Sequence, residues 1–502
     1  MTEVPESVDV VVVGAGNAAM CAALAAREAG AEVVVLERAP AGQHGGNTAF
    51  TAGAMRVVYE SVDDLVALVP DLTEAEIAST EFSVYPAKKF FDDMARVTEY
   101  RADPDLVDAV VTESHATLRW MREKGVRFAP AYGRQAFKVD NRFRFWGGLT
   151  IEVVGGGPGL VETEHRIAVE SGIRVMYGAH VQALVRDGEG IRGVGVRIGG
   201  RKLSIAAGGV VLACGGFQAN PEWRARYLGP NWDLAKVRGT RFNTGDGHRM
   251  ALDVGAAPAG HWSGCHAVAW DRNAPEFGDL AVGDGFQKHS YPFGILVNQR
   301  GRRFLDEGAD FRNYTYAKYG RVILEQPGQY AWQVFDQKVL HLLRDEYRIR
   351  EVTKVQADSL EELARRMGDV DVEGFVEEVA GYNAAVRTDV PFDPTVLDGR
   401  AAVGLAVPKS NWANPLDTPP YVAFEVTCGV TFTFGGVRIT PDTTVVDEDG
   451  APLPGLFAAG EIVGGLFYHN YPGGTGLTAG SVLGRRAGIM AAKAATSRGR
   501  AR

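Results

Sequence analysis

A glycine-rich turn near the start of the chain has the composition needed to bind a dinucleotide. The run Gly14-Ala15-Gly16-Asn17-Ala18-Ala19 follows an apolar, β-branched stretch and precedes an alanine-rich one. The first glycine permits a tight turn, the second lets a pyrophosphate approach the backbone, and the following helix N-terminus favours negative charge. Glu37 ends the next apolar stretch about twenty residues further on, where a carboxylate can bind a ribose hydroxyl pair. The pattern predicts a dinucleotide-binding βαβ unit.

Glycine motifs at both ends of the sequence favour FAD over NAD. Gly45-Gly46-Asn47-Thr48, followed by Gly53, is a second loop that exposes its backbone soon after the first. Near the C-terminus, Leu456-Phe457-Ala458-Ala459-Gly460-Glu461 forms a short strand ending in an acid, and Gly473-Gly474-Thr475-Gly476 opens the last helix. A helix N-terminus aimed at the N1 and C2 carbonyl edge of a reduced flavin stabilises its negative charge. We expect these segments to hold one extended FAD, without a separate NAD(P)H domain.

Alternating strands and helices must position these motifs. Residues 9–13 and 32–37 have the pattern of buried parallel strands, with a helix over 18–29 between them. Period-two patterning over 174–214, with glycines at the turns, predicts a β-meander and a returning strand. Beyond residue 256 aromatic residues and histidines become frequent, and 360–387 has the pattern of one helix. From residue 435 the glycine motifs resume and lead to a closing helix, 476–495.

This order of elements predicts an α/β protein of more than one domain. We expect a Rossmann-like FAD-binding domain, a parallel sheet with a β-meander, from residues 1–255 and 435–502. We expect an inserted α+β capping domain over residues 256–434. A chain of 502 residues exceeds one ordinary core and leaves room for a cofactor between domains.

Charge and cysteine content exclude several classes of protein. The formal net charge of −9 opposes a nucleic-acid partner. The four cysteines lie far apart without a CxxC pair, so we expect no zinc ribbon, no dithiol motif, no bound metal and a reducing cytoplasm. The apolar run 8–26 is preceded by acidic residues and interrupted by Gly14, Gly16 and Asn17, so we expect a buried strand, turn and helix rather than a membrane span.

The ordered motifs resemble those of a known family. Besides the runs above, the chain carries Ala213-Cys214-Gly215-Gly216, Thr244-Gly245-Asp246-Gly247, Gly294-Ile295-Leu296-Val297-Asn298, Gly301-Arg302-Arg303-Phe304 and Phe434-Gly435-Gly436-Val437. This set, in this order over nearly the whole chain, resembles the fumarate reductase and succinate dehydrogenase flavoprotein superfamily. Within it, the runs 467–474 and 306–311 are most similar to the tricarballylate dehydrogenase-like branch, and Tyr471-Pro472-Gly473 also resembles the 3-ketosteroid dehydrogenases.

The resemblance implies how FAD is held. We expect FAD to bind non-covalently, because Thr48 stands where the membrane-complex members carry a flavin-linking histidine, although His44 lies nearby. The residues expected to contact FAD are Gly14, Gly16, Asn17, Ala18, Ala19, Glu37, Arg38, Gly45, Gly46, Asn47, Thr48, Gly53, Val181, Ala213, Cys214, Gly215, Asp246, Gly460, Glu461, Gly476, Leu477 and Thr478.

The resemblance also implies a reaction in which two hydrogens are lost or gained across a C–C bond next to a carbonyl or carboxylate. A hydride passes between carbon and flavin N5, an acid–base group moves the neighbouring proton, and donors hold the oxygen that becomes enolate-like. Arg312, a candidate for proton transfer or substrate binding, lies one place later than the proton-shuttling arginine of the fumarate reductases. Tyr314 and Tyr316 follow closely, and a tyrosinate base there is the rival. His266 falls where the family keeps a substrate-binding histidine.

Two departures from the family bear on the substrate. The segment 431–433 has no histidine before the FGGV stretch, and Tyr471 replaces an arginine. A hydrogen bond to a charged group is worth ~1.5–3 kcal/mol, so a pocket for a small dicarboxylate would lose much of its grip. Tyr471 suits a neutral ketone oxygen or a single carboxylate. Arg56 and Arg241 are candidates for restoring the charge.

We therefore expect an FAD-dependent dehydrogenase that introduces a C=C bond α,β to a carboxylate or ketone and passes electrons to an external acceptor. Two enzymatic alternatives are a cyclic ketone or 3-ketosteroid-type desaturase and a fumarate-type enoate reductase. Outside the enzymes, the chain could serve as the flavin subunit of an electron-transfer assembly.

Overall fold

The structure is a computed structural model that describes residues 4–146 and 148–499. Its α-helices are α1 (Asn17–Glu28), α2 (Val62–Leu68), α3 (Glu74–Ala78), α4 (Ala87–Val97), α5 (Pro104–Lys124), α6 (Tyr132–Gln135), α7 (Gly156–Glu170), α8 (Pro221–Trp223), α9 (Asp246–Asp253), α10 (Tyr316–Leu324), α11 (Leu360–Met367), α12 (Val372–Ala385) and α13 (Thr475–Gly499). Its strands are β1 (Ser7–Val13), β2 (Val33–Leu36), β3 (Ala54–Met55), β4 (Thr80–Glu81), β5 (Phe128–Pro130), β6 (Ala136–Val139), β7 (Arg142–Phe145), β8 (Ile151–Val153), β9 (Arg174–Met176), β10 (His180–Asp187), β11 (Gly190–Ile198), β12 (Arg201–Leu212), β13 (Lys236–Val237), β14 (Pro258–Asp271), β15 (Ile295–Val297), β16 (Tyr330–Phe335), β17 (Lys354–Ala357), β18 (Tyr421–Val437), β19 (Thr444–Val446) and β20 (Pro452–Ala458).

The main sheet joins strands from both ends of the chain. Its path is β10-β11-β12-β1-β2-β9, and β20 pairs with both β12 and β19. The pairs β1–β2, β1–β12, β2–β9 and β12–β20 are parallel, whereas β10, β11 and β12 form an antiparallel meander. The buried valines of β1 and β2 suit central strands that are covered on both faces. The mixed α/β architecture predicted from the sequence is confirmed.

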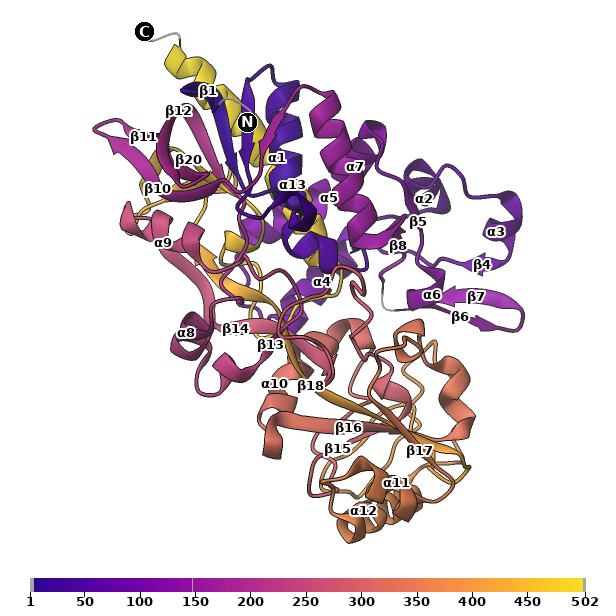
Figure 1. Cartoon of the computed structure of the whole chain (residues 1–502). Helices are drawn as coiled ribbons and strands as arrows, with labels where there is room; N and C mark the ends of the chain where they lie inside the picture. The colour runs from indigo at the N-terminus through magenta and orange to yellow at the C-terminus, as the bar shows by residue number, and fades with distance from the viewer. Residues whose placement is uncertain (1–3, 147, 500–502) are drawn as a thin grey trace.

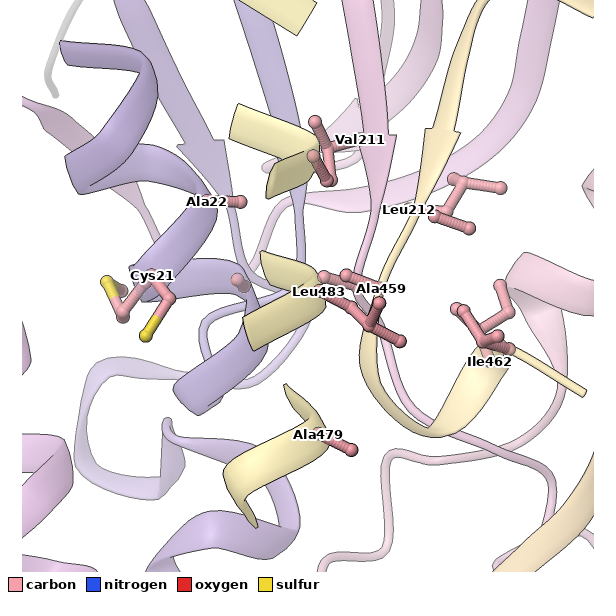
Figure 2. Packing of buried hydrophobic residues seen from close by; sticks show 14 of the residues in the cluster. Cys21, Ala22, Val211, Leu212, Ala459, Ile462, Ala479 and Leu483 are labelled. Atoms are coloured by element: carbon pink, nitrogen blue, oxygen red, sulfur yellow. The ribbon is translucent and has the colours of Figure 1, made fainter. Parts of the chain in front are cut away.

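Helices α1 and α13 pack against one another beside this sheet, although they lie near opposite ends of the chain (Figure 1). Figure 2 shows Ala22 of α1, Leu483 of α13 and Val211 of β12, which belong to one cluster of buried hydrophobic residues. The helices approach closely because α13 carries glycine at the contact: a Cβ on Gly484 would lie 2.4 Å from the Ala18 carbonyl oxygen. A larger side chain at this position would force the two helices apart.

A second sheet follows the path β13-β18-β16-β15, with β14 and β17 also paired to β18. β18 is the central strand of this sheet. It pairs with β14 along its C-terminal part and with β16 and β17 along its N-terminal part. The orange elements β15, β16, β17, α11 and α12 group together in Figure 1, away from the main sheet. The second sheet therefore extends from the neighbourhood of the main sheet to helices α11 and α12.

The segment that contains β6 and β7 packs against the part of the protein built on the second sheet, which we call the second unit. The hairpin of β6 and β7 extends from α6, and its aromatic residues contact the second unit directly. Phe137 stacks edge-on against Phe293, and Trp146 stacks on Phe311 with ring centroids 5.5 Å apart. These contacts pack the hairpin and the residue after it against the loops that flank β15.

The single helix expected over 360–387 is wrong. Two helices occupy this segment, because α11 ends at Gly368, where φ is +82°, and α12 begins anew after Asp371. The Asp371 carboxylate accepts a hydrogen bond from the Gly374 N–H at 3.2 Å and caps the second helix.

In residues 4–146 and 148–499, no helix combines the length and apolar character that crossing a membrane requires.

Candidate active site

A cavity runs from the β1–α1 turn to the second sheet. Its wall at the turn requires glycine, because φ of Gly14 is +106° and a Cβ there would lie 2.4 Å from the Ala213 carbonyl oxygen. Ala213 directly follows β12, the parallel neighbour of β1. The turn and the end of β12 therefore meet at one edge of the sheet, where parallel α/β proteins bind ligands.

Asn17 ties three separated motifs together at this turn. Its backbone N–H donates to Thr48 Oγ1 at 3.1 Å, and its side-chain Nδ2 donates to the Leu477 carbonyl oxygen at 2.9 Å. The loop at 45–48 and the start of α13 thus lie against the N-terminus of α1. Long-range hydrogen bonds from one buried residue, through its backbone and its side chain, fix the relative positions of segments that the sequence separates widely.

Glu37 and Arg38 lie at the outer end of the cavity. Glu37 Oε1 accepts a hydrogen bond from the Ala39 N–H at 2.7 Å, and burial raises the pKa of this carboxyl group. Arg38 Nη1 lies 2.6 Å from Asp246 Oδ2, which joins the start of α9 to the end of β2. Val181 of the meander lines the same region.

Glu461 is partly buried where the two sheets approach one another. Its carboxylate accepts hydrogen bonds from the Thr433 N–H at 2.9 Å and from Gln218 Nε2 and Asn243 Nδ2, each at 3.3 Å. Burial raises the pKa of Glu461 to about 7, and these donors oppose the rise. Because its donors come from three segments, Glu461 holds the cavity wall together whether or not it contacts a ligand.

Most residues expected to contact FAD line this cavity. They are Gly14, Gly16, Asn17, Ala18, Glu37, Arg38, Gly46, Asn47, Thr48, Val181, Ala213, Cys214, Gly215, Asp246, Gly460, Glu461, Gly476 and Leu477. The structure leaves the other four out of the lining. Ala19 is buried inside the core, Gly45 abuts Val161, Gly53 packs on Gly156, and Thr478 Oγ1 donates to the Arg56 carbonyl oxygen at 2.8 Å.

Two tyrosines lie side by side at the inner end of the cavity. The hydroxyl groups of Tyr316 and Tyr471 form a hydrogen bond, and both residues are buried. The loops that carry them are joined, since the Gly473 N–H donates to the Asn313 carbonyl oxygen at 2.9 Å and Asn470 Nδ2 donates to the Tyr314 carbonyl oxygen at 2.6 Å. The start of α10 and the loop before α13 therefore bring the phenols together.

His266 lies beside the tyrosine pair. It stands on β14 opposite Phe432 of β18, and its ring centroid is 4.9 Å from that of Tyr316 and 4.8 Å from that of Tyr471. Neither ring nitrogen has a hydrogen-bond partner among the described residues. Burial and the nearby Arg238 hold the pKa of His266 well below its usual value, so the ring is neutral at neutral pH.

Four arginines line this end of the cavity, and only Arg312 was expected there. Arg238 forms a buried ion pair with Asp284, whose Oδ1 lies 2.6 Å from Arg238 Nη2. Arg134 and Arg344 complete the set. They come from α6, from the segment after β13 and from a loop after β16, so no local motif could have indicated them. Arg56 and Arg241, proposed from the sequence as sources of charge, do not line the cavity.

Comparison with known proteins identifies the family. Residues 9–477 match the model of the FAD binding domain family. The chain belongs to this family. It is 30% identical to a probable fumarate reductase of Shewanella frigidimarina, over 97% of this chain and 75% of that protein. It is 28% identical to 4-oxocyclohex-2-ene-1-carboxylate 5-dehydrogenase of Sinomonas cyclohexanicum, over 98% and 94% of the two chains.

A solved structure has the same fold. The 3-ketosteroid-Δ4-(5α)-dehydrogenase of Rhodococcus jostii RHA1 superposes with a TM-score of 0.71 at 25% identity, over 98% of each chain. The relationship to the fumarate reductase superfamily and the 3-ketosteroid dehydrogenases predicted from the sequence is confirmed. The protein is an FAD-dependent oxidoreductase acting on CH–CH groups.

The residues of the cavity fit FAD. The N-termini of α1 and α13 both open on it, through Asn17 and Ala18 on one side and Gly476 and Leu477 on the other. Neither helix has an acidic residue in its first turn, so nothing repels a phosphate or a negatively charged flavin ring there. Gly16, which precedes α1, contributes no side chain, so the N–H groups of the first turn remain accessible to a pyrophosphate.

Proposed function

We propose that this protein is a dehydrogenase that introduces a C=C bond between the carbons α and β to a ketone or carboxylate carbonyl. The observation that carries the proposal is the hydrogen-bonded pair of Tyr316 and Tyr471 beside His266 in the FAD-binding cavity. One phenol can accept the α proton while the other donates to the carbonyl oxygen. This is the arrangement that enolate formation requires.

Tyr316 is the proton acceptor of the pair and Tyr471 the donor to oxygen. Burial raises the pKa of both phenols. At Tyr316 this rise is opposed by the hydrogen bond with Tyr471 and by the positive charges of Arg238 and Arg312. The negative charge of a phenolate is therefore better stabilised on Tyr316 than on its partner.

The remaining residues bind and orient the substrate. FAD, when bound, would accept the hydride that leaves the β carbon. Tyr471 holds the carbonyl oxygen, and His266 can donate a hydrogen bond from its neutral ring. Arg312, whose guanidinium carbon lies 5.7 Å from the ring centroid of Tyr316, attracts the negative charge of the substrate. This assigns Arg312 to substrate binding rather than to proton transfer.

The FAD contacts and the linkage are also proposals. We assign FAD binding to the lining residues named above, with Glu37 at the ribose. We propose that FAD is held non-covalently. His44 supports this, because its ring lies against His165 and Tyr177, and His44 does not line the cavity.

We propose domain boundaries near residues 255 and 435, so that residues 256–434 cap the FAD-binding domain. The composition of the second sheet supports this division, since β14, β15, β16, β17 and most of β18 fall inside the range. β13 is an exception, because it precedes the range and still pairs with β18. We also propose a cytoplasmic location, in keeping with the four free cysteines.

The whole-length relatives favour a dehydrogenase of carbonyl compounds. The Sinomonas enzyme and the Rhodococcus enzyme are both named as dehydrogenases of ketones, and each is covered almost completely by this chain. The tricarballylate dehydrogenase-like placement remains a narrower proposal. The rival function is the reverse reaction, reduction of an enoate, which the four cavity arginines and the fumarate reductase relative favour.

Flavin absorbance distinguishes these functions. The holoenzyme is mixed without oxygen with 4-oxocyclohexanecarboxylate, cyclohexanone, a 3-ketosteroid, tricarballylate or succinate. A dehydrogenase bleaches the oxidised flavin band with its substrate, and an added artificial acceptor restores it. If no saturated compound bleaches the flavin, while dithionite-reduced enzyme is reoxidised by fumarate or another enoate, the proposed direction is wrong. If neither occurs, a flavin subunit of an electron-transfer assembly becomes the better explanation.

A further inference from the structure

A smaller cavity adjoins the inner end of the FAD-binding cavity. It shares Arg312 and Arg344 with the larger one, and its other walls include Trp146, Phe311 and Trp412. We call this space the side cavity. Most of its lining is aromatic or proline, His289 and Ser290 also line it, and two guanidinium groups stand at the junction.

Several buried donors at the side cavity lack acceptors. Nη1 and Nη2 of Arg344, Nε of Arg312 and Nε1 of Trp146 form no hydrogen bond with any described residue. The side chain of Arg344 is 10% exposed, and Arg312 and Trp146 are each 8% exposed. A buried donor without an acceptor costs about 1–3 kcal/mol, so donors left open together indicate a place where an acceptor binds.

The charges of this region also leave room for an anion. Three of the cavity arginines have a carboxylate within ion-pairing distance: Arg134 with Glu152, Arg238 with Asp284 and Arg344 with Glu346. Arg312 forms no ion pair with any described carboxylate. The Arg344 pair is long, at 3.8 Å, and includes no hydrogen bond. A buried guanidinium without full compensation favours binding of a carboxylate.

We propose that the junction of the side cavity binds a carboxylate of the substrate, with Arg344 and Arg312 as its donors. This inference rests on the proposed function, because it makes the substrate a carbonyl compound with a second, remote carboxylate. In this arrangement the carbonyl oxygen binds at the tyrosine pair and the carboxylate binds at the junction with the side cavity. Arg312 joins the two positions, since its guanidinium carbon is 5.7 Å from the Tyr316 ring centroid and 5.4 Å from that of Trp146.

The electrostatics of Arg344 agree with this assignment. Burial and the neighbouring Arg312 lower its pKa to about 9, so the side chain still carries its charge at neutral pH. A bound carboxylate relieves the repulsion between the two arginines. A planar guanidinium group can donate two parallel hydrogen bonds to the two oxygens of a carboxylate. A neutral amide has only one oxygen and no negative charge, so it binds the guanidinium more weakly.

Binding of a non-reacting probe tests the subsite without turnover. Calorimetric titration of the holoenzyme with cyclohexanecarboxylate and with the neutral cyclohexanecarboxamide measures the contribution of the charge. We expect the carboxylate to bind about 10- to 100-fold more tightly than the amide. Arg344→Gln should remove this preference, Arg344→Lys should restore part of it, and amide binding should not change. Arg348→Gln is the matched control, because Arg348 lies four residues further on and is 55% exposed.

The outcomes separate this inference from the proposed function. Equal binding of carboxylate and amide by the wild-type protein overturns the subsite, and so does an Arg344→Gln variant that keeps the full preference. A preference that depends on Arg344, in a protein whose flavin no ketone reduces, keeps the subsite and overturns the dehydrogenase function. Reduction by cyclohexanone as readily as by 4-oxocyclohexanecarboxylate keeps the function and overturns the subsite.

Discussion

The hydroxyl groups of Tyr316 and Tyr471 share a hydrogen bond although the two residues lie 155 positions apart. One residue begins α10 and the other precedes α13, so the pair forms only when these two elements pack together. The two phenols differ in their surroundings. Burial raises the pKa of both, and the charges of Arg238 and Arg312 oppose this rise at Tyr316, whereas of these two charges only that of Arg238 does so at Tyr471.

Tyr471→Phe should lower the turnover number while leaving FAD bound. The change removes the donor to the carbonyl oxygen, and loss of one such donor typically costs ~3 kcal/mol, or about 100-fold or more in rate. Stopped-flow measurement of the rate of flavin reduction checks this prediction, with whichever carbonyl compound bleaches the flavin of the wild-type protein as substrate. FAD content, read from the ratio of flavin to protein absorbance, is the internal control. Unchanged reduction would remove Tyr471 from oxygen binding.

Tyr316→Phe should nearly abolish flavin reduction and also change its pH dependence. In the wild-type protein, burial keeps the pKa of Tyr316 above its usual value, so the phenolate fraction and the rate should rise with pH throughout the stable range. The variant should lose this rise together with about 100- to 10,000-fold of the rate. A flat wild-type profile, or a variant with the same slope, would assign proton transfer to another group such as Arg312.

Glu461→Gln should change how stability depends on pH. The folded-state pKa of Glu461 is about 7 against an ordinary 4.5, so the folded protein binds this proton more tightly than the unfolded chain does. The resulting stabilisation is fully present below pH 4.5 and is lost as the pH rises through 7. Its size is on the order of 3 kcal/mol.

Thermal unfolding of the holoenzyme between these pH values provides the measurement. The wild-type protein should lose stability relative to Glu461→Gln as the pH rises, and the difference should level off above neutrality. Glu448→Gln serves as control because Glu448 is exposed, and it should follow the wild-type curve. Parallel curves for wild type and Glu461→Gln would contradict the prediction.

Gly484→Ala should destabilise the protein and weaken FAD binding. The added Cβ would lie 2.4 Å from the Ala18 carbonyl oxygen, so α1 and α13 would have to move apart, at a cost of about 1–3 kcal/mol. Both helices present their N-termini to the cavity. Chemical denaturation and FAD titration of the reconstituted protein check the two effects.

Gly381→Ala supplies the matched control for this change. Gly381 is exposed on α12, and a Cβ there would meet nothing within 4 Å. Alanine has the higher helix propensity, so this variant should gain up to about 1 kcal/mol without altering FAD binding. A Gly484→Ala protein as stable as Gly381→Ala would show that the helix contact tolerates a larger side chain.

The sequence was most informative where chemistry requires a local pattern. The turn at Gly14 and the helix that follows it must be contiguous, because a strand, a close backbone approach and a helix N-terminus act together. The meander was similarly visible through its alternation and its turn glycines, such as Gly199 and Gly200. These patterns reflect neighbours in sequence that remain neighbours in space.

The cavity arginines show why the other half of the site could not be predicted from local sequence patterns. Arg134, Arg238 and Arg344 stand on separate elements, and each resembles an ordinary surface arginine in its own segment. Only the packing of the second sheet and the β6–β7 hairpin brings them to one cavity. The sequence pointed instead to Arg56, which is buried and bonded to Tyr85 Oη at 2.7 Å and to the Gly473 carbonyl oxygen at 2.9 Å. Its charge supports the fold of the loop rather than the cavity.

The break between α11 and α12 contradicts the single helix predicted over 360–387. Apolar residues continue on both sides of Gly368, and this pattern favours one long helix. The glycine with positive φ and the capping Asp371 are standard stop and start signals, so the boundary was present in the sequence.

The partnership of α1 and α13 has a consequence for biosynthesis. The ribosome releases α1 early, but the partner that covers its small-residue face and contributes Gly476 and Leu477 to the cavity emerges only after both sheets have been synthesised. Until then the nascent polypeptide exposes that face to chaperones and proteases. We therefore expect flavin loading to wait for the synthesis of α13.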